Sequence, residues 1–230
     1  KLNPGLIAKK TSLPIVTSGL THALSICADM FCDAGDILLL PDKMWGNYRM
    51  IFSTRRGADI RTFPFFASDG GLAVQALRDA LGSCRKKGKI LVLLNFPNNP
   101  TGYMPYPGEA SAVAEALVEV AEDGANIVAC VDDAYTGLFY DDDVYKESLF
   151  SLIAGSHPRL TAIKVDGPTK EDYVWGFRLG FITFSLQTEG GHDKAFTALE
   201  RKVGGLIRGT ISKCSTPSQS LLIHAMKSAG

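Results

Sequence analysis

Short apolar runs alternate with longer amphipathic segments along this chain. The runs rich in Ile, Leu and Val occupy residues 36–40, 90–94, 127–131 and 160–165, and further extended stretches are expected at 14–17 and 177–184. Runs that are apolar on both faces are typical of a parallel sheet with helices on each side. The segments predicted as helices are residues 21–32, 45–56, 72–87, 108–122, 148–154 and 194–211. The pattern therefore predicts a three-layer α/β/α sandwich with a mainly parallel sheet.

The composition supports one large core and argues against two classes of partner. Of 230 residues, 46% are hydrophobic and 21% are charged, which is ordinary for a globular domain. Lys plus Arg and Asp plus Glu number 24 each, so the formal net charge is zero, whereas nucleic-acid binders usually carry a basic excess. No apolar run approaches the roughly 18 residues that a membrane span needs. We therefore expect neither a nucleic acid nor a membrane as partner.

The cysteines and histidines indicate no metal site and no disulfide framework. The five cysteines are widely spaced without a C-x-x-C pair, which favours free structural thiols in a reducing compartment, the cytoplasm. The four histidines are scattered without ligand spacing, so we expect no metal. Neither a G-x-S-x-G elbow nor a P-loop is present in the sequence, which removes the usual hydrolase and phosphate-transfer signatures.

Candidate chemistry follows the predicted strands, because ligands of such sheets collect at the carboxyl ends of the strands. Gly19, Leu20 and Thr21 open a predicted helix, where free backbone N–H groups would cradle a phosphate. An ordinary helix cap is the alternative interpretation of that turn. After the run at 90–94, two prolines and a glycine in residues 95–102 would fix the orientation of the Asn99 amide.

Acidic and basic residues follow the next two strands. Asp132 ends an apolar run, and a buried carboxylate there requires a partner such as a protonated ring nitrogen. Asp133, like residues 141–143, is expected to be a solvated loop acid. After the run at 160–165 comes Lys170, with Arg178 eight residues later. A lysine close to a buried arginine would have its charged form disfavoured, and a neutral amine can attack a carbonyl.

Together these segments resemble the pyridoxal-phosphate aminotransferases of class I/II (fold type I). Residues 98–102 are similar to the family's N-N-P-T-G turn, Asp132 and Tyr135 match its D-x-x-Y strand end, and Lys170 and Arg178 keep its K-x7-R spacing. The segments also occur in the family's order. The resemblance covers residues 1–230 as the family's large, cofactor-binding domain, and it implies pyridoxal 5'-phosphate as cofactor.

The resemblance assigns roles in catalysis to four residues. Lys170 would form the internal aldimine and then act as the base that moves a proton. Asp132 would keep the pyridine nitrogen protonated, so that the ring accepts electrons. Asn99 and Tyr135 would hydrogen-bond the phenolic oxygen of the cofactor. These implied roles make Lys170, Asp132 and Tyr135 the expected catalytic residues.

The remaining implied contacts hold the cofactor. Gly19, Leu20 and Thr21 would bind the phosphate through their backbone, joined by the guanidinium of Arg178. Trp45 falls where the family places an aromatic residue that stacks on the ring, and a tryptophan on a helix face is the alternative.

Three features bear on specificity or depart from the family. Gly167 stands where many members have a phosphate-binding serine, three residues before Lys170. Glu171 and Asp172 follow that lysine and would either face solvent or raise its pKa. Asn99 and Arg208 are candidate substrate-binding residues; Arg208 would reach the distal carboxylate of an aspartate-type substrate across a dimer interface, or else would interact with a helix dipole.

The resemblance implies an aminotransferase that moves an amino group between an amino acid, of aspartate or aromatic type, and a 2-oxo acid. The alternatives are a lyase of the same fold, a β-lyase or a cyclising lyase, and an aminotransferase-like effector domain of a transcription regulator. A homodimer with its active site at the interface is implied as well. The absence of an initiator Met leads us to expect a large domain without the family's N-terminal arm and C-terminal small domain.

Overall fold

A seven-stranded sheet forms the centre of the molecule. The computed structural model describes residues 3–228. The strands are β1 (Ile15–Thr17), β2 (Ile37–Pro41), β3 (Asp59–Phe63), β4 (Lys89–Asn95), β5 (Asn126–Asp132), β6 (Leu160–Asp166) and β7 (Gly180–Ser185). Their order in the sheet is β1-β7-β6-β5-β4-β2-β3. Each predicted apolar run is a strand of this sheet.

The sheet is mainly parallel, as predicted. Strands β3, β2, β4, β5 and β6 pair in parallel, and β7 pairs antiparallel with both β6 and β1. Because β1 and β6 both run opposite to β7, β1 points the same way as the parallel strands. The carboxyl ends of β1, β4, β5 and β6 therefore lie at one edge of the sheet, together with the start of β7.

Helices cover both faces of the sheet. The α-helices are α1 (Leu20–Phe31), α2 (Val74–Cys84), α3 (Pro107–Glu122), α4 (Phe150–Ile153), α5 (His192–Thr210) and α6 (Thr216–Ser228). Shorter segments are η1 (Pro4–Leu6), the π-helical η2 (Arg49–Thr54), η3 (Arg85–Lys87) and η4 (Trp175–Phe177).

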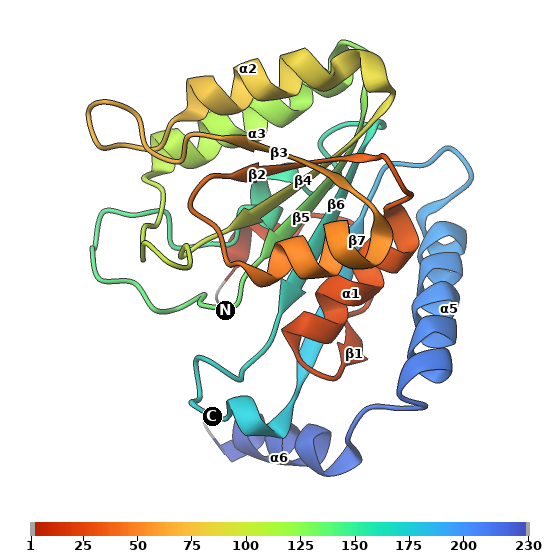
Figure 1. Cartoon of the computed structure of the whole chain (residues 1–230). Helices are drawn as coiled ribbons and strands as arrows, with labels where there is room; N and C mark the ends of the chain where they lie inside the picture. The colour runs from red at the N-terminus through yellow and green to blue at the C-terminus, as the bar shows by residue number, and fades with distance from the viewer. Residues whose placement is uncertain (1–2, 229–230) are drawn as a thin grey trace.

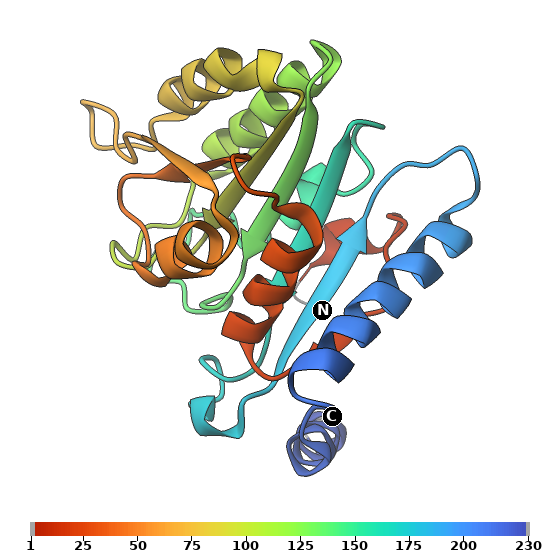
Figure 2. The ribbon, with the colours of Figure 1, turned by 45° about the vertical axis from the view of Figure 1, so that its right-hand side comes forward.

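The core has one half on each face of the sheet. Side chains of α2, α3 and α4 pack with Leu39, Val92 and Ala129 on one face, and those of α1, η2 and α5 pack with Leu38 and Cys130 on the other. Figure 1 shows α2 and α3 side by side on one face of the sheet, and Figure 2 shows α1 beside α5 on the opposite face. The alternating apolar faces of the strands thus produce the predicted three layers.

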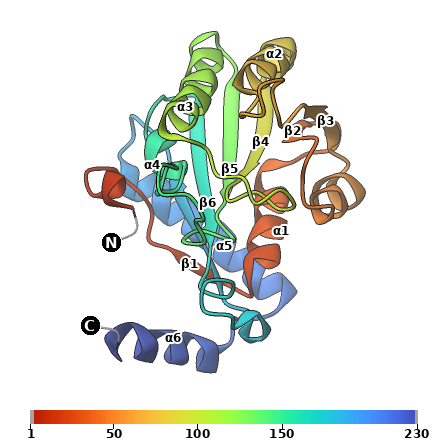
Figure 3. The ribbon, with the colours of Figure 1, turned by 90° about the vertical axis from the view of Figure 1, so that its left-hand side faces the viewer.

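Three elements differ from the sequence-based expectation. Strand β3 is an edge strand that the apolar pattern missed, because Asp59, Arg61 and Thr62 make it polar. Strand β7 begins at Gly180, since Arg178 has a left-handed backbone with φ of 49°. Helix α6 lies beyond 194–211, the last helical segment given above, and Figure 3 shows it beyond the sheet, near the loop that joins β6 to β7.

Candidate active site

A cleft of about 240 Å³ opens at the edge where the carboxyl ends of the strands meet. The residues that line it are Leu20, Thr21, Leu24, Trp45, Tyr48, Asn95, Asn99, Asp132, Ala134, Tyr135, Thr169, Lys170, Trp175 and Arg178. Eight of the residues singled out from the sequence are among them, although they come from five separate segments. Parallel topology brings these segments together, because each one follows a strand or precedes β7 at the same edge.

Asp132 is the buried acid of the cleft. It is the last residue of β5, with 3% of its surface exposed. Tyr48 Oη donates a 2.6 Å hydrogen bond to Asp132 Oδ2, and the Ala134 N–H donates to Oδ1 over 3.1 Å. Burial raises the pKa of Asp132 to about 6, against the opposing effect of these two bonds. A cationic group entering the cleft would lower this pKa again, because a nearby positive charge favours the ionised carboxylate.

Asn95 links Asp132 to the turn that carries Asn99. The Asn95 amide donates to the Asp132 carbonyl oxygen over 2.8 Å and accepts from the Asn99 N–H over 2.7 Å. At the rim of the cleft, Asn99 Nδ2 donates to Tyr135 Oη over 3.5 Å. The amide and the phenol thus approach each other above the buried acid, where both can contact the same ligand oxygen.

Lys170 supplies the amine of the cleft. Its Nζ lies 5.5 Å from the centre of the Tyr135 ring, and the side chain is half-buried. The neighbouring Glu171 and Asp172 are exposed and line a separate hollow with Asp133, so their side chains do not share the cleft with the lysine. The Lys170 amine is therefore placed to contact a ligand in the cleft.

Arg178 and the start of α1 lie together at one end of the cleft. A Cβ atom on Gly19, whose φ is +80°, would lie 2.5 Å from Arg178 Nη2, so only glycine allows this approach. A Cβ on Gly180 would lie 2.8 Å from the Gly19 carbonyl carbon. Arg178 is exposed rather than buried as expected, since its guanidinium lies at the mouth of the cleft beside the helix N-terminus. The unpaired N–H groups of a first helical turn and a guanidinium together favour a phosphate.

Trp45 lies against Tyr48 in the same cleft. The two rings meet edge to face, with centroids 5.5 Å apart and an angle of 88° between their planes. Tyr48 therefore contacts both the predicted stacking residue and the buried acid.

Arg208 is not part of this cleft. It is exposed near the end of α5, where its Nη1 donates to Ser212 Oγ over 2.9 Å. Its predicted role across a dimer interface stays a prediction.

Gly167 and Asp133 line a hollow separate from the cleft. A Cβ on Gly167 would lie 2.8 Å from the Leu179 carbonyl oxygen and 3.0 Å from Gly180 Cα, so the backbone leaves no room for serine here. Asp133 is buried, which corrects the expectation of a solvated acid. Its Oδ2 lies 3.1 Å from the buried Lys164 Nζ, which also pairs with Asp166. Lys164 therefore supplies a countercharge to Asp133 inside the protein, in the place where solvent was expected.

Tyr48, Asn95 and Thr169 were not predicted as site residues, yet all three line the cleft. Each carried a signal: Tyr48 lies one helical turn after Trp45, Asn95 ends an apolar strand, and Thr169 precedes Lys170.

The whole chain matches one family of proteins. Residues 2–230 match the family model described as aminotransferase class I and II. The chain belongs to the aminotransferase class I and II family. This assignment accounts for the order of the segments that meet at the cleft.

Individual members of the family show the same likeness. This aminotransferase-family chain is 25% identical over 95% of its length to 1-aminocyclopropane-1-carboxylate synthase 6 of rice, and 26% identical over 73% of its length to the aspartate aminotransferase of Musicola paradisiaca. It spans 38% and 39% of those proteins. An aminotransferase structure from Anaerococcus prevotii superposes with a TM-score of 0.82 at 27% identity, over 94% of this chain and 52% of that one.

Proposed function

We propose that the protein is a pyridoxal-phosphate-dependent aminotransferase acting on an amino acid and a 2-oxo acid. Family membership supports the cofactor, since the family depends on pyridoxal phosphate. The observation that carries the proposal is the joint presence in one cleft of a buried acid, an amine and an anion site. These three groups suit a molecule with a ring nitrogen, an aldehyde and a phosphate.

Each end of the cleft has one task in this proposal. Arg178, with the backbone N–H groups of Leu20 and Thr21, binds the phosphate. Asp132 holds a proton on the ring nitrogen, and its raised pKa falls when that cation approaches. Trp45 contacts the ring, and Asn99 and Tyr135 donate hydrogen bonds to the phenolic oxygen.

Lys170 does the proton transfer. When bound, the cofactor supplies an aldehyde that bonds amines and a ring that accepts the electron pair released at the substrate's α-carbon. Lys170 Nζ would hold the cofactor covalently between turnovers, and during turnover it would move a proton between the substrate's α-carbon and the cofactor carbon that carries the aldehyde. Lys170→Ala is therefore expected to abolish turnover, because both roles are lost.

The substrates and assembly are further parts of the proposal. Asn99 and Arg208 are proposed to bind substrate, Arg208 by reaching into the active site of a partner subunit in a homodimer. We place the protein in the cytoplasm, in keeping with its five free cysteines. Within residues 3–228, no helix combines the length and apolar character needed to cross a membrane.

A cyclising lyase is the second candidate, favoured by the 25% identity to the rice synthase over 95% of this chain. An assay of the full-length protein separates the two. A panel of amino acids is supplied with 2-oxoglutarate as acceptor, and formation of 2-oxo acids is measured. Transamination predicts product only when the acceptor is present. Release of a 2-oxo acid without an acceptor would favour a β-lyase, whereas consumption of the amino acid without an acceptor and without any 2-oxo acid would favour the cyclising lyase.

A further inference from the structure

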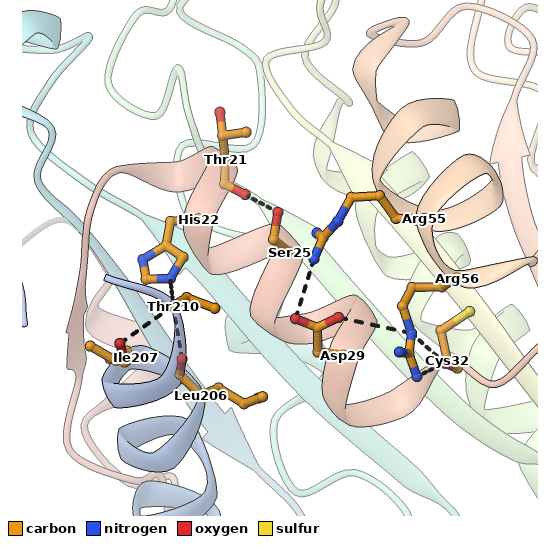
Figure 4. Close-up of polar contacts among 10 residues, drawn as sticks. All are labelled: Thr21, His22, Ser25, Asp29, Cys32, Arg55, Arg56, Leu206, Ile207 and Thr210. Atoms are coloured by element: carbon orange, nitrogen blue, oxygen red, sulfur yellow. Dashed lines mark hydrogen bonds and ion pairs between the residues drawn. The ribbon is translucent and has the colours of Figure 1, made fainter. Parts of the chain in front are cut away.

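His22 lies behind the phosphate end of the cleft and faces away from it. It is in the first turn of α1, one residue after Thr21, which lines the cleft. Its Nδ1 accepts a 3.1 Å hydrogen bond from the Ser18 N–H. Its Nε2 lies 3.3 Å from Thr210 Oγ1 at the end of α5, and Figure 4 shows the ring pointing from α1 toward that residue.

The hydrogen-bond partners of His22 determine which of its ring nitrogens carries a proton. The Ser18 N–H can only donate, so Nδ1 must present a lone pair. Thr210 Oγ1 donates its proton to the Leu206 carbonyl oxygen over 2.8 Å, so its oxygen must accept from the imidazole. Both contacts require a neutral ring with its proton on Nε2.

The surroundings of His22 favour the same neutral form. Desolvation by burial lowers the pKa of His22, against a smaller opposing effect of Asp29. Asp29 itself pairs with Arg55 over 3.5 Å and with Arg56 over 3.9 Å (Figure 4). Its charge is thus partly met by cations on the neighbouring η2 region.

The turn that His22 holds leads directly into the anion site. The Gly19 carbonyl oxygen accepts from Thr17 Oγ1 over 3.1 Å and from the Ala23 N–H over 3.2 Å. The imidazole fixes the preceding N–H, that of Ser18. The backbone is therefore held on both sides of the Ser18–Gly19 peptide, and the following N–H groups of Leu20 and Thr21 keep one direction.

We propose that His22 is a positioning residue of the phosphate site, which orients the turn at the start of α1 through Ser18 and anchors it to α5 through Thr210. The ligand class is a phosphate monoester dianion, and the inference rests on the proposed function of the cleft. His22 acts through the backbone and does not touch the ligand.

The test compares two ligands on the cofactor-free, full-length protein. Pyridoxal 5'-phosphate and pyridoxal differ only in the phosphate, so a defect confined to the first locates the effect at the anion site. His22→Leu removes both contacts of the imidazole. It is expected to lower the affinity for pyridoxal 5'-phosphate about tenfold, as for the loss of one hydrogen bond at a ligand-binding backbone. The affinity for pyridoxal should not change. His22→Asn keeps an acceptor for the Ser18 N–H and should restore most of the affinity.

A matched control and a spectroscopic readout complete the experiment. Ser25→Ala removes a neighbouring hydroxyl of α1 that donates to the Thr21 carbonyl oxygen over 2.9 Å, and it should change neither affinity. The ¹⁵N chemical shifts of the His22 ring should show the neutral form with its proton on Nε2 at pH 7, and Thr210→Val should reduce that preference. The ring measurement on the unmodified protein stands even where His22→Leu does not fold.

Three results would overturn the role of His22. The first is that His22→Leu lowers the affinity for both ligands equally, and the second is that it leaves the affinity for pyridoxal 5'-phosphate unchanged. The third is a His22 ring protonated on Nδ1. If the unmodified protein binds neither ligand, the proposed function fails first, and the ring signals still report whether the network exists.

Discussion

Tyr48 donates a 2.6 Å hydrogen bond to Asp132 although 84 positions separate the two residues in the chain. Both side chains are buried, at 1% and 3% exposure. The bond stabilises the ionised carboxylate and lowers the pKa of Asp132, which burial raises. Tyr48 thereby tunes the acid that is proposed to hold the ring nitrogen of the cofactor.

Tyr48→Phe is expected to raise the pKa of Asp132 further above 6, because the carboxylate loses its phenol donor. The measurement is a ¹³C carboxyl titration of the cofactor-free protein by NMR, with the Asp132 signal identified by its loss in Asp132→Asn. Tyr106→Phe is the control, since Tyr106 donates to the exposed Asp141 at 2.8 Å, outside the cleft. An unchanged Asp132 titration in Tyr48→Phe would contradict the tuning role.

Asp132→Asn is expected to stabilise the cofactor-free protein at neutral pH. The native pKa is raised from 3.8 to about 6, so the native state binds the extra proton between these values, and stability is lost as pH rises from about 4 to 6. The shift corresponds to about 3 kcal/mol above pH 6. The amide of this variant would keep only one of the two hydrogen bonds that Asp132 accepts, which costs part of this difference. The expected net gain in the free energy of unfolding is about 2 kcal/mol.

Urea unfolding of both forms at pH 4 and pH 7.5 measures this difference. The gain should appear at pH 7.5 and vanish at pH 4. Asp141→Asn, at an exposed acid, serves as control and should show no gain at pH 7.5. If Asp132→Asn changes the free energy of unfolding equally at the two pH values, the pKa of Asp132 is not raised in the native state.

Gly167→Ser is expected to destabilise the protein. The added Cβ would lie 2.8 Å from the Leu179 carbonyl oxygen, and such overpacking typically costs 1–3 kcal/mol, so we expect about 2 kcal/mol. Gly82 in α2 has nothing within 4 Å of an added Cβ, so Gly82→Ala should gain about 0.5–1 kcal/mol. Urea unfolding measures the stability of both variants. An unchanged free energy of unfolding in Gly167→Ser would mean that the β6–β7 loop relaxes freely.

Lys164→Met should be strongly destabilising. Lys164 is buried and pairs with Asp133 and Asp166, and removing one member of a buried ion pair costs about 3–5 kcal/mol. Lys146→Met removes an exposed pair with Asp142 and should cost under about 0.5 kcal/mol. Similar unfolding midpoints for the two variants would show that Lys164 is not the neutralising partner of Asp133.

The sequence reveals those parts of the fold and site that depend on neighbours along the chain. The apolar runs that became β2, β4, β5 and β6 are local, and so are the positions of Asn99, Asp132 and Lys170 after them. Burial of Asp133 was not predictable in this way, because its partner Lys164 lies on the next strand, 31 positions later.

Contacts between segments that are far apart in the chain were not predictable from the sequence either. Tyr48 gains its role only when η2 packs beside the end of β5, and β3 is too polar at Asp59 and Arg61 to be recognised before its pairing with β2 is seen. The glycine pair Gly19 and Gly180 shows the same limit, since the guanidinium of Arg178 requires glycine at 19 and the backbone of Gly19 requires glycine at 180.

The most direct test of the proposed function is to find which lysine holds the cofactor. The full-length protein is loaded with pyridoxal 5'-phosphate, reduced with borohydride, digested and analysed by peptide mass spectrometry. The proposed site predicts a yellow protein whose pyridoxyl label lies on Lys170. A label on Lys164 or Lys194, or no bound cofactor at all, would contradict it.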